Sequence, residues 1–180
     1  MKIVIYLILV IFFSARLEAQ TIKIGSLQYG SVNWELKLIK DTGLDKKFGI
    51  DLEIVELASK NAAAVALQGR AVDIIITDWE MEPMNGLELI KTIRTDPESP
   101  NRFVPIIVVT GYAAPKRVME ARDAGMTEFV VKPFTAEHII KRITHVINYP
   151  RDFVETKTYI GPNRRRHSDD DYFGPERRKR

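Results

Sequence analysis

The sequence contains no cysteine, which excludes disulfide bonds and any metal site built on thiolates. It also lacks an apolar run long enough to cross a bilayer. The unbroken run Ile3–Phe13 is shorter than the roughly 20 residues that a membrane-spanning helix needs, so we expect no stable membrane insertion. What remains is a chain of 180 residues with 45% hydrophobic composition, enough to bury the core of one α/β domain with appendages.

Excess charge is also missing from most of the chain. Residues 151–180 hold nine Lys or Arg against six Asp or Glu, which equals the whole net charge of +3, and the other 150 residues balance at 18 against 18. The alkaline isoelectric point is therefore a property of the C-terminal segment and says nothing about a folded surface.

The N-terminus has the pattern of a targeting signal. Lys2 precedes the apolar run, and Leu17 and Ala19 stand at the −3 and −1 positions of a cleavage site. We interpret residues 1–20 as a secretory signal peptide. An uncleaved anchor and a spurious upstream translation are the alternatives.

Apolar runs and helical stretches alternate after this leader, as in β-α units around a parallel sheet. The candidate strands are Thr21–Leu27, Asp51–Leu57, Asp73–Thr77, Val104–Thr110 and Glu128–Val131. The candidate helices are Asn33–Asp41, Ser59–Leu67, Gly86–Arg94, Lys116–Ala124 and Ala136–Ile147. The order predicts one α/β domain over residues 21–148, a flavodoxin-like, doubly wound, five-stranded parallel sheet of order 2-1-3-4-5. Ligands of such a sheet bind beyond the carboxyl ends of the strands.

Three polar side chains are expected at that edge. Asp78 directly follows the third candidate strand, Thr110 ends the fourth, and Lys132 follows the fifth. A carboxylate, a hydroxyl and an ammonium group would thus converge at one place on the sheet.

The residues around these three groups resemble the receiver domains of bacterial two-component response regulators. The resemblance rests on four segments in the right order over roughly 75 residues: Asp78–Gly86, Val108–Gly111, Ala124–Gly125 and Phe129–Phe134. The resemblance implies a signalling module that is related to the chemotaxis regulators and is not an enzyme. It also implies that this module works in the cytoplasm. It also implies a cis peptide bond between Lys132 and Pro133.

The resemblance assigns a role to each residue. Asp78 would be the phosphoacceptor and a Mg²⁺ ligand, with the backbone carbonyl of Glu80 as a second ligand. Lys132 would pair with a phosphoryl oxygen, Thr110 would move to bind another, and Phe129 would follow as the switch residue. The implied partners are a sensor histidine kinase or phosphotransfer protein and a downstream protein on the face of the fourth helix, fifth strand and fifth helix.

One element of the receiver pattern is absent. A receiver's first strand normally ends in two adjacent acidic residues that complete the Mg²⁺ site, whereas this strand ends Ile24–Gln28 and the next carboxylate is Glu35. Because Mg²⁺ holds poorly with few protein carboxylates, we expect weak Mg²⁺ binding and impaired phosphorylation.

Residues 1–78 resemble a different family, the periplasmic substrate-binding proteins of sulfonate, nitrate or taurine transporters. This resemblance rests on the leader and on four segments: Lys23–Gly25, Gly43–Gly49, Ala66–Gly69 and Val72–Ile74. It predicts a gene junction within residues 71–79, with a transporter-like half over 21–71 and a receiver half over 72–148.

The chimera hypothesis leaves two alternative functions open. The chain could be an exported solute-binding fragment whose cleft is lined by Tyr29–Ser31 and Ser59–Asn61, or a non-functional chimera. Localisation is equally divided, because the leader predicts export to the periplasm whereas a receiver works in the cytoplasm.

The last segment, residues 149–180, is polar and punctuated by Gly and Pro, so we predict a flexible basic tail. It holds a near repeat, Tyr159–Arg166 and Tyr172–Lys179. Its arginines and tyrosines could contact nucleic acid, but a solvated tail is the simpler interpretation. The three histidines lack metal-ligand spacing with other donors and are predicted to be solvated or packed: His138, His145 and His167.

Overall fold

We analysed a computed structural model of the chain, which describes residues 19–27, 31–57, 62, 66–67, 69–80, 85–111 and 114–164. Several sequence predictions lie wholly or largely outside these residues. They are the signal peptide, the helix after Ser59, most of the transporter-type cleft, and the tail beyond residue 164. Within the described part, no helix combines the length and hydrophobicity needed to cross a membrane.

The centre of the molecule is the five-stranded parallel sheet that the sequence predicts, in the order β2-β1-β3-β4-β5. Each observed strand begins and ends within two residues of its prediction: β1 Gln20–Leu27, β2 Ile50–Leu57, β3 Ile74–Asp78, β4 Ile106–Thr110 and β5 Glu128–Val131. Every residue of β3 and β4 is buried, as expected for central parallel strands covered on both faces.

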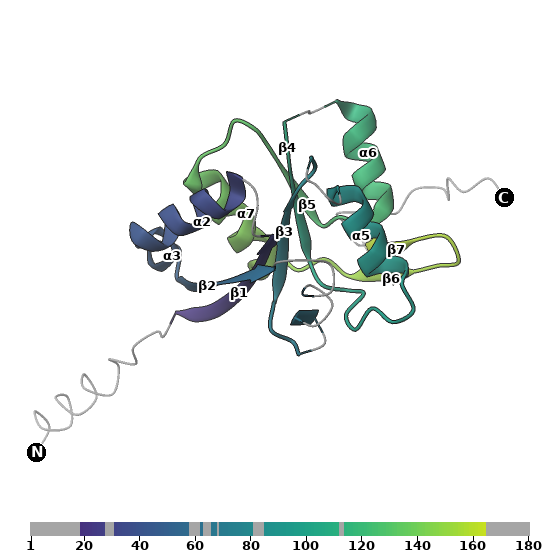
Figure 1. Cartoon of the computed structure of the whole chain (residues 1–180), viewed down its shortest axis with the longest axis horizontal. Helices are drawn as coiled ribbons and strands as arrows, with labels where there is room; N and C mark the ends of the chain where they lie inside the picture. Colours follow the sequence, from purple (N-terminus) through teal and green to yellow (C-terminus); the bar gives the residue numbers. More distant parts are fainter. Residues whose placement is uncertain are drawn as a thin grey trace, which may run out of the picture.

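Helices cover both faces of the sheet (Figure 1). One face carries α2 Ser31–Asp41, α3 Leu44–Lys47 and α7 Ala136–Asn148, and the other carries α5 Gly86–Thr95 and α6 Pro115–Ala124. Each face has its own apolar core, centred on Leu36 and Ile140 on the first face and on Ile90 and Val108 on the second. The doubly wound architecture is thereby confirmed.

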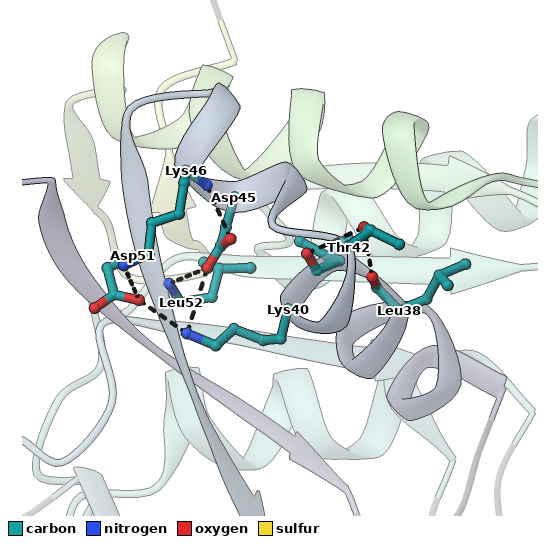
Figure 2. Close-up of polar contacts among 8 residues, drawn as sticks. Leu38, Lys40, Thr42, Asp45, Lys46, Asp51 and Leu52 are labelled. Carbon is teal, nitrogen blue, oxygen red and sulfur yellow. Dashed lines mark hydrogen bonds and ion pairs between the residues drawn. The ribbon is translucent and has the colours of Figure 1, made fainter.

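Helix α3 is not among the predicted helices, and it occupies one of the segments that resemble transporter proteins. It lies between Gly43 and Gly49, whose φ angles of 65° and 76° suit glycine. The buried carboxylate of Asp45 accepts hydrogen bonds from the backbone N–H of Lys46 at 2.8 Å and of Leu52 at 3.1 Å (Figure 2). The segment therefore has a structural role, since Asp45 ties the short helix to β2.

Two lysines complete this corner (Figure 2). Lys40 Nζ lies 3.4 Å from Asp45 and 2.8 Å from Asp51, and Lys46 Nζ lies 2.6 Å from Asp51. Hydrogen bonds from Lys40 and Lys46 lower the pKa of Asp51 to about 2, and the hydrogen bond to Asp51 raises the pKa of Lys40.

The prediction of a flexible tail from residue 149 is wrong over its first part. Strands β6 Phe153–Glu155 and β7 Ile160–Pro162 form an antiparallel hairpin that lies beside α5 (Figure 1). The ring of Phe153 meets Phe103 edge to face at 5.7 Å and lies 5.1 Å from the guanidinium of Arg94. One aromatic anchor thus orders a segment whose polar composition suggested disorder.

Candidate functional site

Asp78 is the last residue of β3, and its side chain is only 8% exposed. It is opposite Val109 in the parallel ladder, and the N–H of the following Trp79 donates to the Val109 carbonyl at 2.7 Å. The ladder therefore continues past the acceptor candidate and fixes its backbone at the carboxyl edge of the sheet.

Lys132 is brought to Asp78 from the end of β5. Its ammonium group forms an ion pair with Asp78 Oδ2, and its backbone N–H donates to the Thr110 carbonyl at 2.8 Å. The peptide bond from Lys132 to Pro133 is cis. Thr110 is buried, lies opposite Val131 in the ladder and is therefore a backbone neighbour of Lys132. The structure brings these residues together at one edge, while their chemical roles stay predictions.

The other carboxylate oxygen of Asp78, Oδ1, also has a hydrogen-bond partner. The backbone N–H of Glu80 donates to Asp78 Oδ1 at 3.3 Å, so a cation and an amide dipole both face the same carboxylate. A carboxylate of low exposure held at both oxygens in this way has a fixed orientation, as a nucleophile requires.

Glycine is required at position 86 by the close approach of α5 to this edge. A Cβ on Gly86 would lie 2.4 Å from the Asp78 carbonyl oxygen. The preceding Asn85 caps α5, with its side chain accepting from the N–H of Glu88 at 2.9 Å. The Asn-Gly pair therefore sets both the start of the helix and its distance from the acceptor candidate.

An ion pair at the rim of the site was not predicted. Arg117, in the first turn of α6, lies 3.0 Å from the carboxylate of Glu80. The two residues are 37 positions apart, so no local pattern could indicate the contact. The pair links the segment after β3 to the helix after β4.

The acids present do not fit a magnesium centre made of several carboxylates. Residues 19–34 contain no Asp or Glu, and in the described part of the chain no three metal-binding side chains of His, Asp or Glu type lie together. The carboxylate of Glu80 is engaged by Arg117, and Asp78 is engaged by Lys132. The described residues therefore provide Mg²⁺ with fewer oxygen ligands than it prefers.

Phe129, the predicted switch residue, lies on β5 and is partly buried against the core beneath α5 and α6. It also lines a groove of about 520 Å³ between β5 and α7, together with two valines and four basic or titratable residues: Val130, Val131, His138, Lys141, Arg142 and His145.

Two of the histidines, His138 and His145, line this groove. The ring nitrogen of His138 and the hydroxyl of Thr135 form a reciprocal cap at the start of α7, and the ring of His145 lies 5.4 Å from that of Tyr149. His167 lies outside the described residues.

Comparison with known proteins identifies the family. The response regulator receiver domain matches residues 39–144. The chain is 35% identical over 74 residues to the chemotaxis protein CheY-3 of Vibrio cholerae and 40% identical over 76 residues to CheY1 of Helicobacter pylori, covering 41% of this chain in each case. It spans only 55% and 58% of the length of these two relatives. A CheY homolog of Campylobacter jejuni is 34% identical over 111 residues, which are 62% of this chain and 76% of that protein.

Solved structures show the same fold. Vibrio cholerae CheY4 superposes with a TM-score of 0.54 at 27% identity, covering 70% of this chain and 98% of that one. The receiver domain of the sensor histidine kinase PA1611 from Pseudomonas aeruginosa, solved with a magnesium ion in its active site cleft, gives a TM-score of 0.50 at 22% identity. It covers 69% of this chain and 95% of that one.

The receiver match also corrects the extent of the likeness. We predicted that it begins near residue 72, but it begins at residue 39, inside α2, and crosses the segment 71–79. It covers more than half of the chain and contains Asp78, Thr110, Phe129 and Lys132. This chain belongs to the response regulator receiver domain family.

Proposed function

We propose that this receiver accepts a phosphoryl group on Asp78 and passes the signal on through a protein partner. The observation that carries the proposal is the carboxylate of Asp78 at the end of β3, held between the Lys132 ammonium group and the Glu80 backbone N–H. In this chemistry a carboxylate oxygen attacks phosphorus, an acyl phosphate forms, and the bond from phosphorus to the donor's leaving group breaks.

Lys132 supplies positive charge for this step. The phosphoryl group carries more negative charge than the free carboxylate, and an ammonium group beside it offsets part of that charge. Thr110, next to Lys132 at the edge, would bind another phosphoryl oxygen, and Phe129 would follow its movement. This arrangement would change the affinity of a partner by shifting the population of two conformers.

We further infer that acceptance is slow compared with receivers that have a full set of acids. Mg²⁺ would normally neutralise charge on the transferred group, and the solved PA1611 receiver holds this ion in its cleft. The present chain offers the Asp78 carboxylate and the Glu80 carbonyl without an acidic pair from β1. Weak metal binding follows from this small ligand set.

The partner surface proposed here is the face of α6, β5 and α7. The groove between β5 and α7 supports it, because Phe129 lines the groove and thus connects it to the switch. The donor would be a sensor histidine kinase or a phosphotransfer protein, which places the working protein in the cytoplasm. The leader's export signal stays an untested prediction that conflicts with this location.

The gene junction also stays a prediction. We favour a continuous receiver because the match to the receiver domain begins at residue 39 and runs across the predicted junction. Amplification of source DNA across codons 60–90 tests it. A single contiguous product shows that the source carries one gene across this segment, and failure to obtain one shows that the junction arose in sequence assembly.

Phosphoryl transfer from radiolabelled acetyl phosphate with Mg²⁺ tests the function directly. The wild-type chain should become labelled, and Asp78→Asn should abolish the label. Asp41→Asn is the matched control, because Asp41 is exposed at the end of α2, and this variant should be labelled like wild type. Label that survives Asp78→Asn would refute the assignment.

A further inference from the structure

The C-terminal hairpin contacts the rest of the domain through its second strand, β7. Gly161 in β7 approaches Gly125 at the end of α6 so closely that a Cβ on Gly161 would lie 2.7 Å from Gly125 Cα. A Cβ on Gly125 would lie 2.4 Å from the Ile160 carbonyl oxygen. Two backbones thus meet without side chains between them, so this contact selects glycine on both sides.

Side chains on both sides of Gly161 make further contacts that hold the hairpin in place. The Tyr159 hydroxyl donates to the Pro162 carbonyl at 2.8 Å, which closes the turn around Gly161. The guanidinium of Arg164 lies 4.3 Å from the Tyr159 ring centroid and pairs with Asp123 of α6 at 3.1 Å. The sequence Tyr-x-Gly-Pro-x-Arg is therefore a docking motif. Its receiving surface, which we call the α6-end dock, consists of Asp123 and Gly125 with strand β6 alongside.

The chain contains this motif twice. Residues 172–177 read Tyr-Phe-Gly-Pro-Glu-Arg, against Tyr-Ile-Gly-Pro-Asn-Arg at 159–164. All four residues that make the contacts above recur at the same spacing: Tyr172, Gly174, Pro175 and Arg177.

The two positions that differ make backbone contacts in the first copy. Ile160 meets Gly125 through its carbonyl, and Asn163 donates its backbone N–H to the Asp152 carbonyl at 2.7 Å. Because both contacts are made by the backbone, they do not depend on the two side chains that differ between the copies.

We propose that residues 172–177 are a second ligand for the α6-end dock and that the two copies compete for it within one chain. The connection from β6 to the motif is residues 156–158 for the first copy and residues 156–171 for the second. Loop-closure entropy disfavours the longer connection by roughly tenfold if the contacts are equal. The first copy is then the principal occupant, and the second takes its place when the first is removed.

Paramagnetic relaxation in the full-length chain tests this exchange. Because the sequence has no cysteine, Lys179→Cys gives one nitroxide attachment site beside the second motif. With the first motif intact, amide signals of residues 123–126 should broaden weakly. Adding Gly161→Val, whose Cβ clashes with the dock, should broaden them strongly, and adding Gly174→Val as well should abolish the effect.

Two further measurements make the result decisive. Tyr159→Ala with Arg164→Ala disables the first motif without adding volume and should give the same strong broadening as Gly161→Val. Unbroadened signals at residues 123–126 in both variants, with the sheet signals unchanged, would overturn the proposal. Broadening that arises only between a labelled and an unlabelled chain in a mixed sample would also overturn it, because the ligand would then come from a second molecule.

Discussion

We expect the buried guanidinium of Arg94 to make a large contribution to stability. This side chain is buried in α5 and donates three hydrogen bonds to backbone carbonyls. Its acceptors are Gly125 at 3.0 Å, Arg102 at 2.7 Å and Val104 at 2.8 Å. Burial lowers the pKa of Arg94 to about 10, which still leaves the guanidinium charged at neutral pH. One cation therefore joins α5, the segment before β4 and the end of α6.

The perturbation is Arg94→Met, which keeps much of the apolar stem but removes every donor. Hydrogen bonds from charged groups contribute about 1.5–3 kcal/mol each, and two of the three carbonyls would remain buried without this partner. Because such losses overlap, we expect unfolding free energy to fall by about 3–5 kcal/mol. With a urea m-value of about 2 kcal/mol/M, the midpoint falls by roughly 2 M.

The assay is urea unfolding followed by far-ultraviolet circular dichroism. Lys91→Met is the control, since Lys91 is exposed on the same helix and its loss should change stability by less than about 0.5 kcal/mol. Arg94→Lys should recover little of the lost stability, because one ammonium group cannot reach three separated carbonyls. Equal midpoints for Arg94→Met and wild type would show that the three hydrogen bonds of Arg94 do not stabilise the fold.

Further predictions concern the site and the corner at α3. Gly86→Ala places a Cβ 2.4 Å from the Asp78 carbonyl and should destabilise by about 1–3 kcal/mol while reducing labelling of Asp78, measured by urea unfolding and by phosphoryl transfer. If the unfolding free energy and the labelling of Asp78 both match wild type, the close approach of α5 to Asp78 does not require glycine at position 86. The pKa of Asp51, about 2 when folded, lies below its ordinary value of 3.8, so its contribution to stability is present above pH 4 and is lost as pH falls toward 2. Asp51→Asn should therefore flatten the acid side of a stability-against-pH curve, and an unchanged slope would contradict the ion pairs with Lys40 and Lys46.

The sheet could be predicted from sequence because its central strands are buried on both faces. Ile74–Thr77 and Ile106–Thr110 are short β-branched runs between polar or helical segments, which leaves little freedom in placing them. The site followed from topology, since residues at the carboxyl ends of parallel strands share one edge. Asp78 and Lys132 meet for that reason, although 54 residues separate them.

What the sequence did not reveal depends on contacts between distant residues. Helix α3 is four residues long and is held by the Asp45 carboxylate, so no helical periodicity marks it. The hairpin at residues 153–162 is ordered by Phe153 against Arg94 and by one glycine against another. Gly161, one of the Gly and Pro residues that suggested flexibility, is the residue whose missing Cβ permits the close approach to Gly125.

The chimera hypothesis rested on a different kind of sequence pattern. The absence of an acidic pair after β1 and the transporter-like segments suggested a second parent for residues 21–71, yet the receiver match reaches back to residue 39. Strand-helix units of unrelated parallel sheets share short apolar and glycine patterns, because the same packing requirements act on both. Such patterns indicate architecture more securely than ancestry.

The most direct test of the central claim is to locate the phosphoryl group chemically. After treatment with acetyl phosphate, borohydride reduction converts an aspartyl phosphate to homoserine, which peptide mass spectrometry assigns to a position. We expect homoserine at residue 78 and a lower yield in Lys132→Met than in wild type. Modification at another residue, or an unmodified residue 78 in a chain that carries phosphate, would contradict this expectation.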